Sequence, residues 1–318
     1  MTSKADHMEE LEATAKKLMA TTWKTCAIGL SEIRRWLEQF SPSAAPEDDE
    51  QLHALYLLTR FLYFDQESVR ELLKAVFRDL YRTPILHDLR RSNADTLDRG
   101  LLDSGFKKAL DQTRFLGVGN PSESGVHLLY YFRQENHLSK SFFINSHEIF
   151  RSVRDAVGVS IKVKNTQIRR YVFIDDLCGS GTQAKEYLKD LVDALKALDH
   201  TVRVSYFVLF ATQDGLQAVK DLQCFDDVEA VYELDESFRC LEPSSRIFNP
   251  PALPFDRLKI RGTCEKFGKR LWPKYPLGYK DGQLLLGFYH NTPDNTLPIF
   301  WMPEGWTPIF RRYHKEVS

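Results

Sequence analysis

The feature that most constrains the fold of this 318-residue chain is an apolar strand that runs into two aspartates, a glycine-rich turn and a helix. Tyr171 to Ile174 form the apolar run, and Asp175 and Asp176 follow it directly. The turn from Gly179 to Gln183 leads into apolar residues at helical spacing, namely Ala184, Tyr187, Leu188, Leu191, Leu195 and Leu198. Such a strand and helix are typical of an open α/β sheet, where ligands bind at the carboxyl end of the strands.

The segments that follow repeat the alternation of strand and helix. Residues 202–210 predict a second buried strand, residues 214–222 a helix, and residues 229–234 a shorter strand. This order implies parallel pairing with right-handed crossovers. We therefore expect an α/β protein with a parallel sheet flanked by helices.

Upstream of the motif, short apolar runs at residues 114–118 and 126–132 predict two further strands. A loop rich in glycine and serine joins them, and residues 146–157 predict a helix. A basic, polar segment with Lys162, Lys164, Arg169 and Arg170 then leads to the central strand.

The two ends of the chain have different patterns. The first hundred residues show apolar positions at helical spacing, broken by a proline-containing stretch at residues 41–46. The tail predicts strands at residues 284–290 and 297–301, punctuated by prolines. We expect an all-helical extension over residues 1–105 and one sheet domain over residues 106–318, with a β-rich C-terminal segment.

The chemistry of the central motif fits a ligand with a phosphate at one end and hydroxyl groups at the other. Gly179 and Gly181 let the backbone approach an anion closely, and Ser180 and Thr182 add hydroxyl donors. The N-terminus of a helix favours phosphate. Two carboxylates would repel phosphate unless they face sugar hydroxyls or a magnesium ion. Ribose-5-phosphate offers both ends.

Other interpretations of the same residues exist. Ser180 and Gln183 have the spacing of a helix capping box, which explains those two residues but neither the aspartates nor the glycines. An acidic strand also occurs in nucleoside triphosphatases, but the sequence contains no phosphate-binding G-x-x-x-x-G-K-[ST] motif. No G-x-G-x-x-G follows a strand, so a dinucleotide site is not indicated.

Residues 173–183 resemble the phosphoribosyl pyrophosphate loop of type I phosphoribosyltransferases. The resemblance implies that Asp175 and Asp176 hold the ribose hydroxyls, directly or through Mg²⁺, and act as the catalytic pair. It implies that the turn with Gly179, Ser180, Gly181, Thr182 and Gln183 holds the 5′-phosphate. Two departures make ordinary purine salvage doubtful. The turn reads Ser-Gly-Thr-Gln, and glycine stands at 179, where several purine-salvage members have an aspartate.

Over about residues 113–302 the chain more closely resembles a divergent branch of this superfamily, found in bacterial conflict and anti-phage systems, including retron-type loci. The features that carry the likeness are the central motif, the loop at 117–125 and the tail at 291–301. The resemblance implies a toxic or regulatory effector that acts on nucleotides. It leaves open whether the chain is an enzyme or a nucleotide-sensing module without turnover.

Two other segments are candidate parts of the site. The superfamily places its pyrophosphate-contacting loop where this chain has Gly119, Ser122, Ser124 and Gly125, although an ordinary connecting loop explains them equally well. In the tail, Asn291, Asp294 and Asn295 are candidates for contacts to a base or acceptor, with turn formation as the alternative.

Composition excludes some classes of function. The 43 basic and 44 acidic residues balance, so no global field favours nucleic acid or membrane. Five scattered cysteines without metal-ligand spacing predict free thiols in a reducing compartment. No segment resembles a signal peptide or membrane span, and we expect a cytoplasmic protein. The N-terminal helices are a candidate docking surface for a protein or ribonucleoprotein partner.

Overall fold

A computed structural model describes residues 3–24, 26, 28–119, 124–155, 158–249 and 255–312. The chain forms two compact units, one of residues 1–69 together with 234–318, the other of residues 70–233. The expected boundary at residue 105 differs from this division. The periodicity of the first hundred residues correctly indicates helices, but it carries no information on which distant segment each helix packs against.

The first unit combines both ends of the chain around an aromatic core. Its helices and strands are α1 (Lys4–Ala20), α2 (Leu30–Leu37), α3 (Glu50–Leu58), β1 (Leu62–Phe64), α10 (Arg257–Leu271) and β8 (Leu286–Phe288). Trp36 from α2 stacks on Phe300 with ring centroids 5.3 Å apart. The indole nitrogens of Trp36 and Trp306 each donate to the carbonyl of Ile299 at 2.9 Å. The tail is therefore part of the same hydrophobic core as the N-terminal helices.

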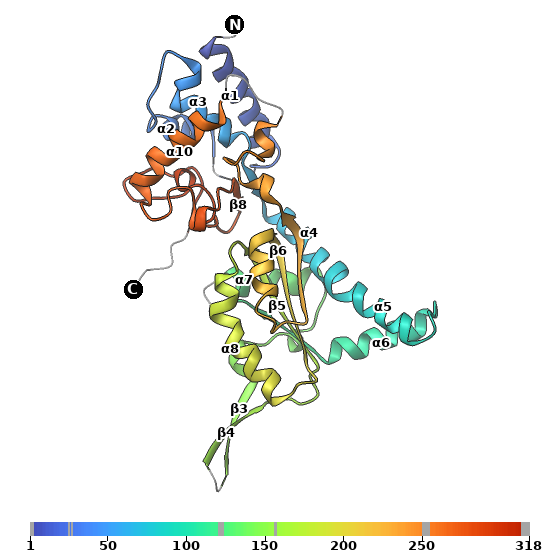
Figure 1. Ribbon diagram of the computed structural model, residues 1–318. Coiled ribbons are helices and arrows are strands. Elements are labelled where there is room, and N and C mark those ends of the chain that lie inside the picture. The colour runs from blue at the N-terminus through green and yellow to red at the C-terminus, as the bar shows by residue number, and fades with distance from the viewer. Residues whose placement is uncertain are drawn as a thin grey trace. The chain divides into compact units, whose positions relative to one another are not determined.

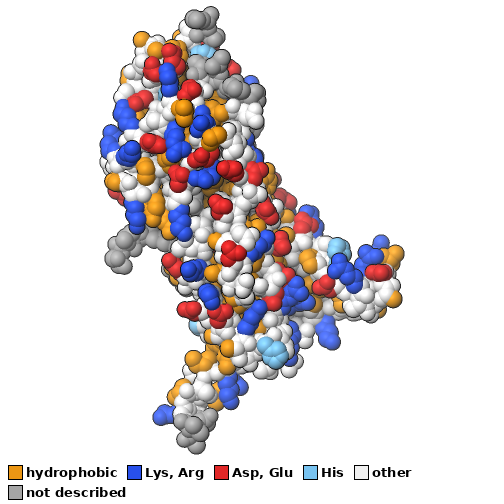
Figure 2. All heavy atoms as spheres, viewed as in Figure 1, with side chains coloured by type: hydrophobic (Ala, Val, Ile, Leu, Met, Phe, Trp, Pro, Cys, Tyr) orange, Lys and Arg blue, Asp and Glu red, His pale blue; other side chains and the backbone are white. Residues whose placement is uncertain are grey.

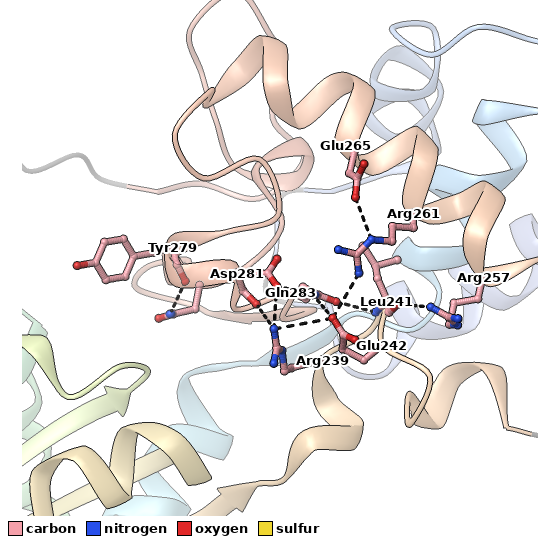
Figure 3. A network of polar contacts seen from close by, with 10 residues as sticks. Arg239, Leu241, Glu242, Arg257, Arg261, Glu265, Tyr279, Asp281 and Gln283 are labelled. Carbon is pink, nitrogen blue, oxygen red and sulfur yellow. Dashed lines mark hydrogen bonds and ion pairs between the residues drawn. The ribbon is translucent and has the colours of Figure 1, made fainter. Parts of the chain in front are cut away.

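The tail contains less strand than the sequence predicted. Of residues 284–290 only β8 is a strand, and it pairs in parallel with β1. Residues 298–300 form a turn of 3₁₀-helix instead of a strand. A polar network holds the loops together around the fully buried Gln283 (Figure 3). Its side-chain amide donates to Glu242 at 2.6 Å and to Asp281 at 3.0 Å.

The second unit is an α/β sheet with helices on both faces (Figure 1). Its elements in chain order are the end of α4 (Gln66–Ala75), a π-helical stretch (Val76–Arg82), α5 (Thr83–Ser92), α6 (Arg99–Asp111), β2 (Thr113–Gly117), α7 (Ser124–Glu135), β3 (Phe150–Asp155), β4 (Gly158–Val163), β5 (Arg170–Cys178), α8 (Thr182–Leu198), β6 (Arg203–Thr212), α9 (Gln213–Lys220) and β7 (Asp227–Leu234). The strand order is β2-β5-β6-β7, and β5 pairs in parallel with both of its neighbours.

The two faces of this sheet have separate cores. On one face, Phe173, Tyr206 and Val208 pack with apolar residues of α8 and α9. On the other face, Phe115 of β2 contacts Tyr81 and Phe132, with ring centroids 5.1 Å apart in both pairs. The predicted parallel sheet flanked by helices is confirmed.

Two element predictions in this unit are wrong. Residues 126–132 lie in α7, because a short apolar run fits a buried helix as well as a strand. Residues 146–157 were expected to be helical, but a single 3₁₀ turn at Ser146–Glu148 is followed by β3, which pairs with β4 in an antiparallel hairpin. β4 has three β-branched residues, Val159, Ile161 and Val163, which favour a strand, and cross-strand pairing with β4 outweighs the helix propensity of β3.

Candidate functional site

Loops from neighbouring strands meet at the carboxyl edge of the sheet in the second unit. Gly117 at the end of β2 lies beside Ile174 of β5, one residue before the aspartates. Cys178 at the end of β5 lies beside Ala211 of β6. The next residue of β6, Thr212, is the N-cap of α9. The β2–α7, β5–α8 and β6–α9 connections therefore leave the sheet at one edge, as the sequence motif predicted.

The turn between β5 and α8 is fixed by close packing and one left-handed glycine. Gly181 has φ +69°, and a Cβ there would lie 3.0 Å from the Cβ of Ala218. The Thr212 hydroxyl donates to the carbonyl of Gly179 at 2.6 Å and accepts from the amide of Gly215 at 2.9 Å. Gly215 has no room for a side chain, since a Cβ would lie 2.5 Å from the carbonyl of Cys178. The neighbouring β6–α9 connection thus holds the turn in place.

The capping-box interpretation of Ser180 and Gln183 is not what the structure shows. The N-cap of α8 is Gly181, which has no side chain to cap the helix. The Ser180 hydroxyl instead lies 2.9 Å from the hydroxyl of Thr182. Two hydroxyls therefore lie together at the start of α8, where the helix dipole favours an anion.

The two aspartates occupy different environments. Asp175 is 1% exposed, and its carboxylate accepts hydrogen bonds from the hydroxyl of Tyr206 at 3.4 Å and the amide of Asp176 at 3.0 Å. Burial, and then the negative charge of Asp176, raise the pKa of Asp175 well above its usual range. Asp176 is half-buried, and its carboxylate accepts from the amide of Leu177 at 2.8 Å. The side chains of the two aspartates also hydrogen-bond each other, but only Asp176 is partly exposed.

Buried groups around Asp175 are held in their neutral forms. Burial raises the pKa of the Cys178 thiol to about 12 and that of Tyr206 well above its ordinary value. All five cysteines are free, as predicted, and four of them are buried. Tyr206 and Thr212 were not predicted as part of the site. Both lie in β6, and only the register of β6 against β5 shows that they neighbour the motif.

The candidate pyrophosphate loop is described in part. Gly119 follows β2 with φ +89°, and the backbone of Ser124 and Gly125 opens α7. Ser122 lies outside the described residues. The register of β2 against β5 brings Gly119 to the same edge of the sheet as Asp176, and contact with a pyrophosphate group stays a prediction.

The candidate base-contacting residues lie in the other unit, where they hold a turn together. The Asn295 amide is buried and donates to the carbonyl of Tyr279 at 3.1 Å. Asp294 accepts from Arg312 at 3.2 Å, and the side chain of Asn291 accepts from the amide of Thr292 at 3.0 Å. These bonds account for the three residues as turn formers, and a role in binding a base stays a prediction.

Metal-binding side chains do not cluster in the parts of the chain that the structure describes. No group of three histidine, cysteine, aspartate or glutamate residues lies close enough there to hold a metal ion. Within the same residues, no helix is long and apolar enough to cross a bilayer.

Comparison with known proteins identifies a family. A family model described as PRTase-CE matches residues 33–312. No curated protein matches. Among solved structures, a xanthine-guanine-hypoxanthine phosphoribosyltransferase from Helicobacter pylori matches with 10% identity and a TM-score of 0.28, over 55% of this chain and 86% of that one.

Two further solved structures are similar at the same low level. An orotate phosphoribosyltransferase from Aeropyrum pernix matches with 16% identity and a TM-score of 0.24, over 41% of this chain and 72% of that one. The AQ2163 protein from Aquifex aeolicus matches with 11% identity and a TM-score of 0.29, over 65% of this chain and 86% of that one.

Proposed function

We propose that this chain, which belongs to the PRTase-CE family of phosphoribosyltransferase-like proteins, binds phosphoribosyl pyrophosphate or a nucleotide at the carboxyl edge of its parallel sheet. In this proposal Asp176 contacts the ribose hydroxyls. The turn from Gly179 to Gln183 holds the 5′-phosphate, and the loop after β2 faces the pyrophosphate. The observation that carries the proposal is the fixed turn at Gly181, which places two hydroxyls and a helix N-terminus beside the end of β5.

The proposal assigns different roles to the two aspartates because their exposure differs. The half-buried Asp176 is accessible from the edge of the sheet, whereas Asp175 is enclosed by the core. Asp175 therefore stabilises the end of β5 from within the core, through its hydrogen bonds to the hydroxyl of Tyr206 and the amide of Asp176. It holds Asp176 in place and does not itself reach the ligand.

Magnesium fits this arrangement as an ion shared with the ligand. Mg²⁺ in phosphate sites commonly takes one or two carboxylates together with phosphate oxygens and water. Asp176 is the more accessible carboxylate and would take part directly, whereas the buried Asp175 would act through Asp176. When bound, the ion would neutralise charge on the pyrophosphate group.

If the chain turns over, the reaction is a substitution at the ribose C1′. The bond from C1′ to the pyrophosphate oxygen breaks, pyrophosphate leaves with the electron pair, and an acceptor atom forms the new bond to C1′. Asp176 and the turn hold the two ends of the sugar while positive charge develops on the ring. Positioning and electrostatics supply much of the rate enhancement in reactions of this kind. In this reaction the described residues of the turn need not act as a general base.

The setting that we propose is a bacterial anti-phage system in which the chain acts as a cytoplasmic effector. The observations that support this setting are the departures of the motif from purine-salvage enzymes and the additional unit built from both chain ends. In this setting the helices of residues 1–69 are the candidate contact for a protein or ribonucleoprotein partner.

The second candidate function is a nucleotide sensor of the same fold, without turnover. Gly179 favours it, because this position has no side chain to move a proton and its carbonyl is bound by Thr212. A sensor would bind the ligand through the same turn and Asp176 but release no product.

Calorimetric titration of the full chain with phosphoribosyl pyrophosphate and Mg²⁺, with product analysis of the same mixtures, tests the proposal. Asp176→Asn should weaken binding roughly 10- to 100-fold, since a hydrogen bond to a charged group contributes about 1.5–3 kcal/mol. Asp190→Asn makes the same change at an exposed site on α8 and should have no effect. Released pyrophosphate supports the enzyme, and binding without product supports the sensor. Absence of binding to the folded wild-type protein would refute both.

A further inference from the structure

The candidate site has two ends, and a chain of buried side chains connects them. One end is the half-buried carboxylate of Asp176, and the other is the start of α8, where the hydroxyls of Ser180 and Thr182 lie 2.9 Å apart. A ligand that carries ribose hydroxyls and a phosphate must contact both ends at once. The separation of the two ends therefore matters, since a misplacement of about 1 Å can cost on the order of 100-fold in rate.

The charge of the surface does not relieve this requirement. Figure 2 shows acidic and basic side chains interspersed on the visible face of the described residues. On that face no large patch of one charge would attract a phosphorylated ligand from a distance. Affinity must then come from the placement of the groups at the site itself.

The register of β6 against β5 places Tyr206 in the core beside the aspartates. Tyr206 lies opposite Phe173, two residues before Asp175, so the tyrosine and the aspartate are diagonal neighbours on one face of the sheet. Tyr206 is 1% exposed, and its ring packs against Phe225 with centroids 5.7 Å apart. The packing of the ring fixes the position of the hydroxyl.

The hydroxyl of Tyr206 connects to the aspartate end of the site. It donates to the carboxylate of Asp175 at 3.4 Å, and Asp175 also accepts from the amide of Asp176 at 3.0 Å. The side chains of the two aspartates hydrogen-bond each other as well. A displacement of the Tyr206 hydroxyl would therefore reach Asp176 through a single buried residue.

The same hydroxyl connects to the turn through Cys178. The buried Cys178 thiol hydrogen-bonds the hydroxyl of Tyr206, and its sulfur also accepts from the backbone amide of Gly181. Because the hydroxyl donates its one proton to Asp175, its oxygen accepts from the thiol. Gly181 is the N-cap of α8 and carries the left-handed φ of the turn. The sulfur thus contacts the residue on which the geometry of the phosphate end depends.

We propose that Cys178 and Tyr206 are positioning residues that fix the separation between the ribose end and the phosphate end of the candidate site. This inference rests on the proposed binding of a ribose phosphate at the edge of the sheet. The chain of contacts runs from the amide of Gly181 through the thiol and the hydroxyl to Asp175 and Asp176.

Packing alone does not account for a thiol and a hydroxyl at these two positions. Apolar residues would fill the same core equally well, whereas each buried polar group must find a hydrogen-bond partner. Groups that are hydrogen-bonded in series within a core strengthen one another and respond as a unit. The pair therefore transmits the position of one end of the site to the other.

Calorimetric titration of the full chain with ribose 5-phosphate and, separately, with inorganic phosphate tests this role. Tyr206→Phe should weaken binding of ribose 5-phosphate roughly 3- to 10-fold, because Asp176 is no longer held at a fixed distance from the turn. Binding of inorganic phosphate should stay close to that of the wild type, since this ligand contacts the turn alone.

Variants of Cys178 test whether the two residues act together. Cys178→Ala should reproduce the pattern of Tyr206→Phe, and the double variant should bind no more weakly than either single variant. Cys178→Ser keeps a donor and an acceptor and should recover most of the lost affinity. Losses that simply add in the double variant would contradict a common chain of contacts.

Two matched controls separate positioning from stability. Tyr81→Phe removes a buried hydroxyl that donates to Thr113 at 2.8 Å. Cys224→Ala removes a buried thiol of the same core that precedes β7, at the amino end of the sheet. Both variants should lower the free energy of unfolding and leave both affinities unchanged. Equal losses of affinity in the Tyr81 and Tyr206 variants would overturn the proposal.

Infrared spectroscopy tests the thiol contact without a ligand. The S–H stretching band of Cys178, isolated by subtracting the spectrum of the matching Cys178→Ala variant, should shift in Tyr206→Phe. An unchanged band overturns the positioning role even where the edge-site proposal holds. Wild-type protein that binds neither ligand refutes the edge-site proposal and the positioning role with it. Wild-type binding of ribose 5-phosphate that Tyr206→Phe leaves unchanged refutes the positioning role alone.

Discussion

At the scale of single residues, the turn between β5 and α8 depends on Gly181 more than on any side chain. Its φ of +69° is costly for other residues, and its Cα faces Ala218 and the carbonyl of Gly215 at close range. A non-glycine residue in such a conformation costs about 1–3 kcal/mol. The candidate phosphate site is thus built on backbone geometry that substitution disturbs.

We predict that Gly181→Ala lowers the free energy of unfolding by about 1–3 kcal/mol and abolishes binding of a phosphorylated ligand. Gly262→Ala is the matched control, because it lies within α10 with nothing within 4 Å of the added Cβ. That change should be neutral or slightly stabilising. Chemical denaturation of both variants measures the difference, and equal stability of the two would contradict the role given to Gly181.

Thr212 holds the same turn from the neighbouring strand. Its hydroxyl caps α9 and also binds the carbonyl of Gly179. We predict that Thr212→Ala destabilises the protein by about 1–2 kcal/mol, because a cap and a hydrogen bond are lost together. Ser180→Ala should cost under about 0.5 kcal/mol, since Ser180 does not cap α8. Thermal unfolding of the two variants distinguishes these outcomes.

At the scale of elements, one ion pair links the N-terminal ends of two neighbouring strands. Asp227 of β7 accepts from Arg203 and Ser205 of β6, both at 2.8 Å. Burial opposes ionisation of Asp227, but these hydrogen bonds outweigh it and lower the pKa below the ordinary value of 3.8. A lowered pKa in the folded state contributes stability above pH 3.8, and this contribution is lost as the pH falls through the folded-state pKa.

We therefore predict that Asp227→Asn is less stable than the wild type at pH 7, by on the order of 1 kcal/mol because the pair is partly solvated. The difference should shrink as the pH falls below about 4. Denaturant unfolding across this pH range measures it. A difference independent of pH would show that the carboxylate charge does not matter.

Elements whose signals are local could be predicted from the sequence. Periodicity, glycines and the aspartate pair placed β5, α8, β6, α9 and β7 correctly. The prediction for α7 was wrong because an apolar run of seven residues has no decisive period. The prediction for β3 was wrong because its partner β4 (Gly158–Val163) was not recognised: most of β4 precedes the basic segment that begins at Lys162. The unequal burial of Asp175 and Asp176 could not be predicted, since it depends on the tyrosine that β6 places opposite Phe173.

At the scale of the whole molecule, the chain passes from the first unit to the second and back again. The helices of residues 1–69 share a core with the tail, as the stacking of Trp36 on Phe300 and of Phe61 on Phe310 shows. Hydrophobic periodicity indicates that each of these segments is buried. It does not indicate that segments more than two hundred residues apart pack together. This is why the sequence placed the boundary at 105.

We predict that removal of residues 1–69 unfolds the tail and leaves the second unit folded, because the first unit then loses half of its core. Limited proteolysis with mass spectrometry should show rapid cleavage within residues 255–312 and protection of the strands of residues 113–212. Protection of the tail in the truncated protein would show that it folds without the N-terminal helices.

The division of the first unit between two segments of the chain also bears on the order of events at the ribosome. Chains are synthesised from the N-terminus, and domains fold as their residues emerge. The unit of residues 70–233, which carries the candidate site, is complete before the tail that closes the aromatic core has been made. Until translation ends, the helices of residues 1–69 therefore lack the tail that covers their apolar faces. We expect a chaperone to bind these faces during that time.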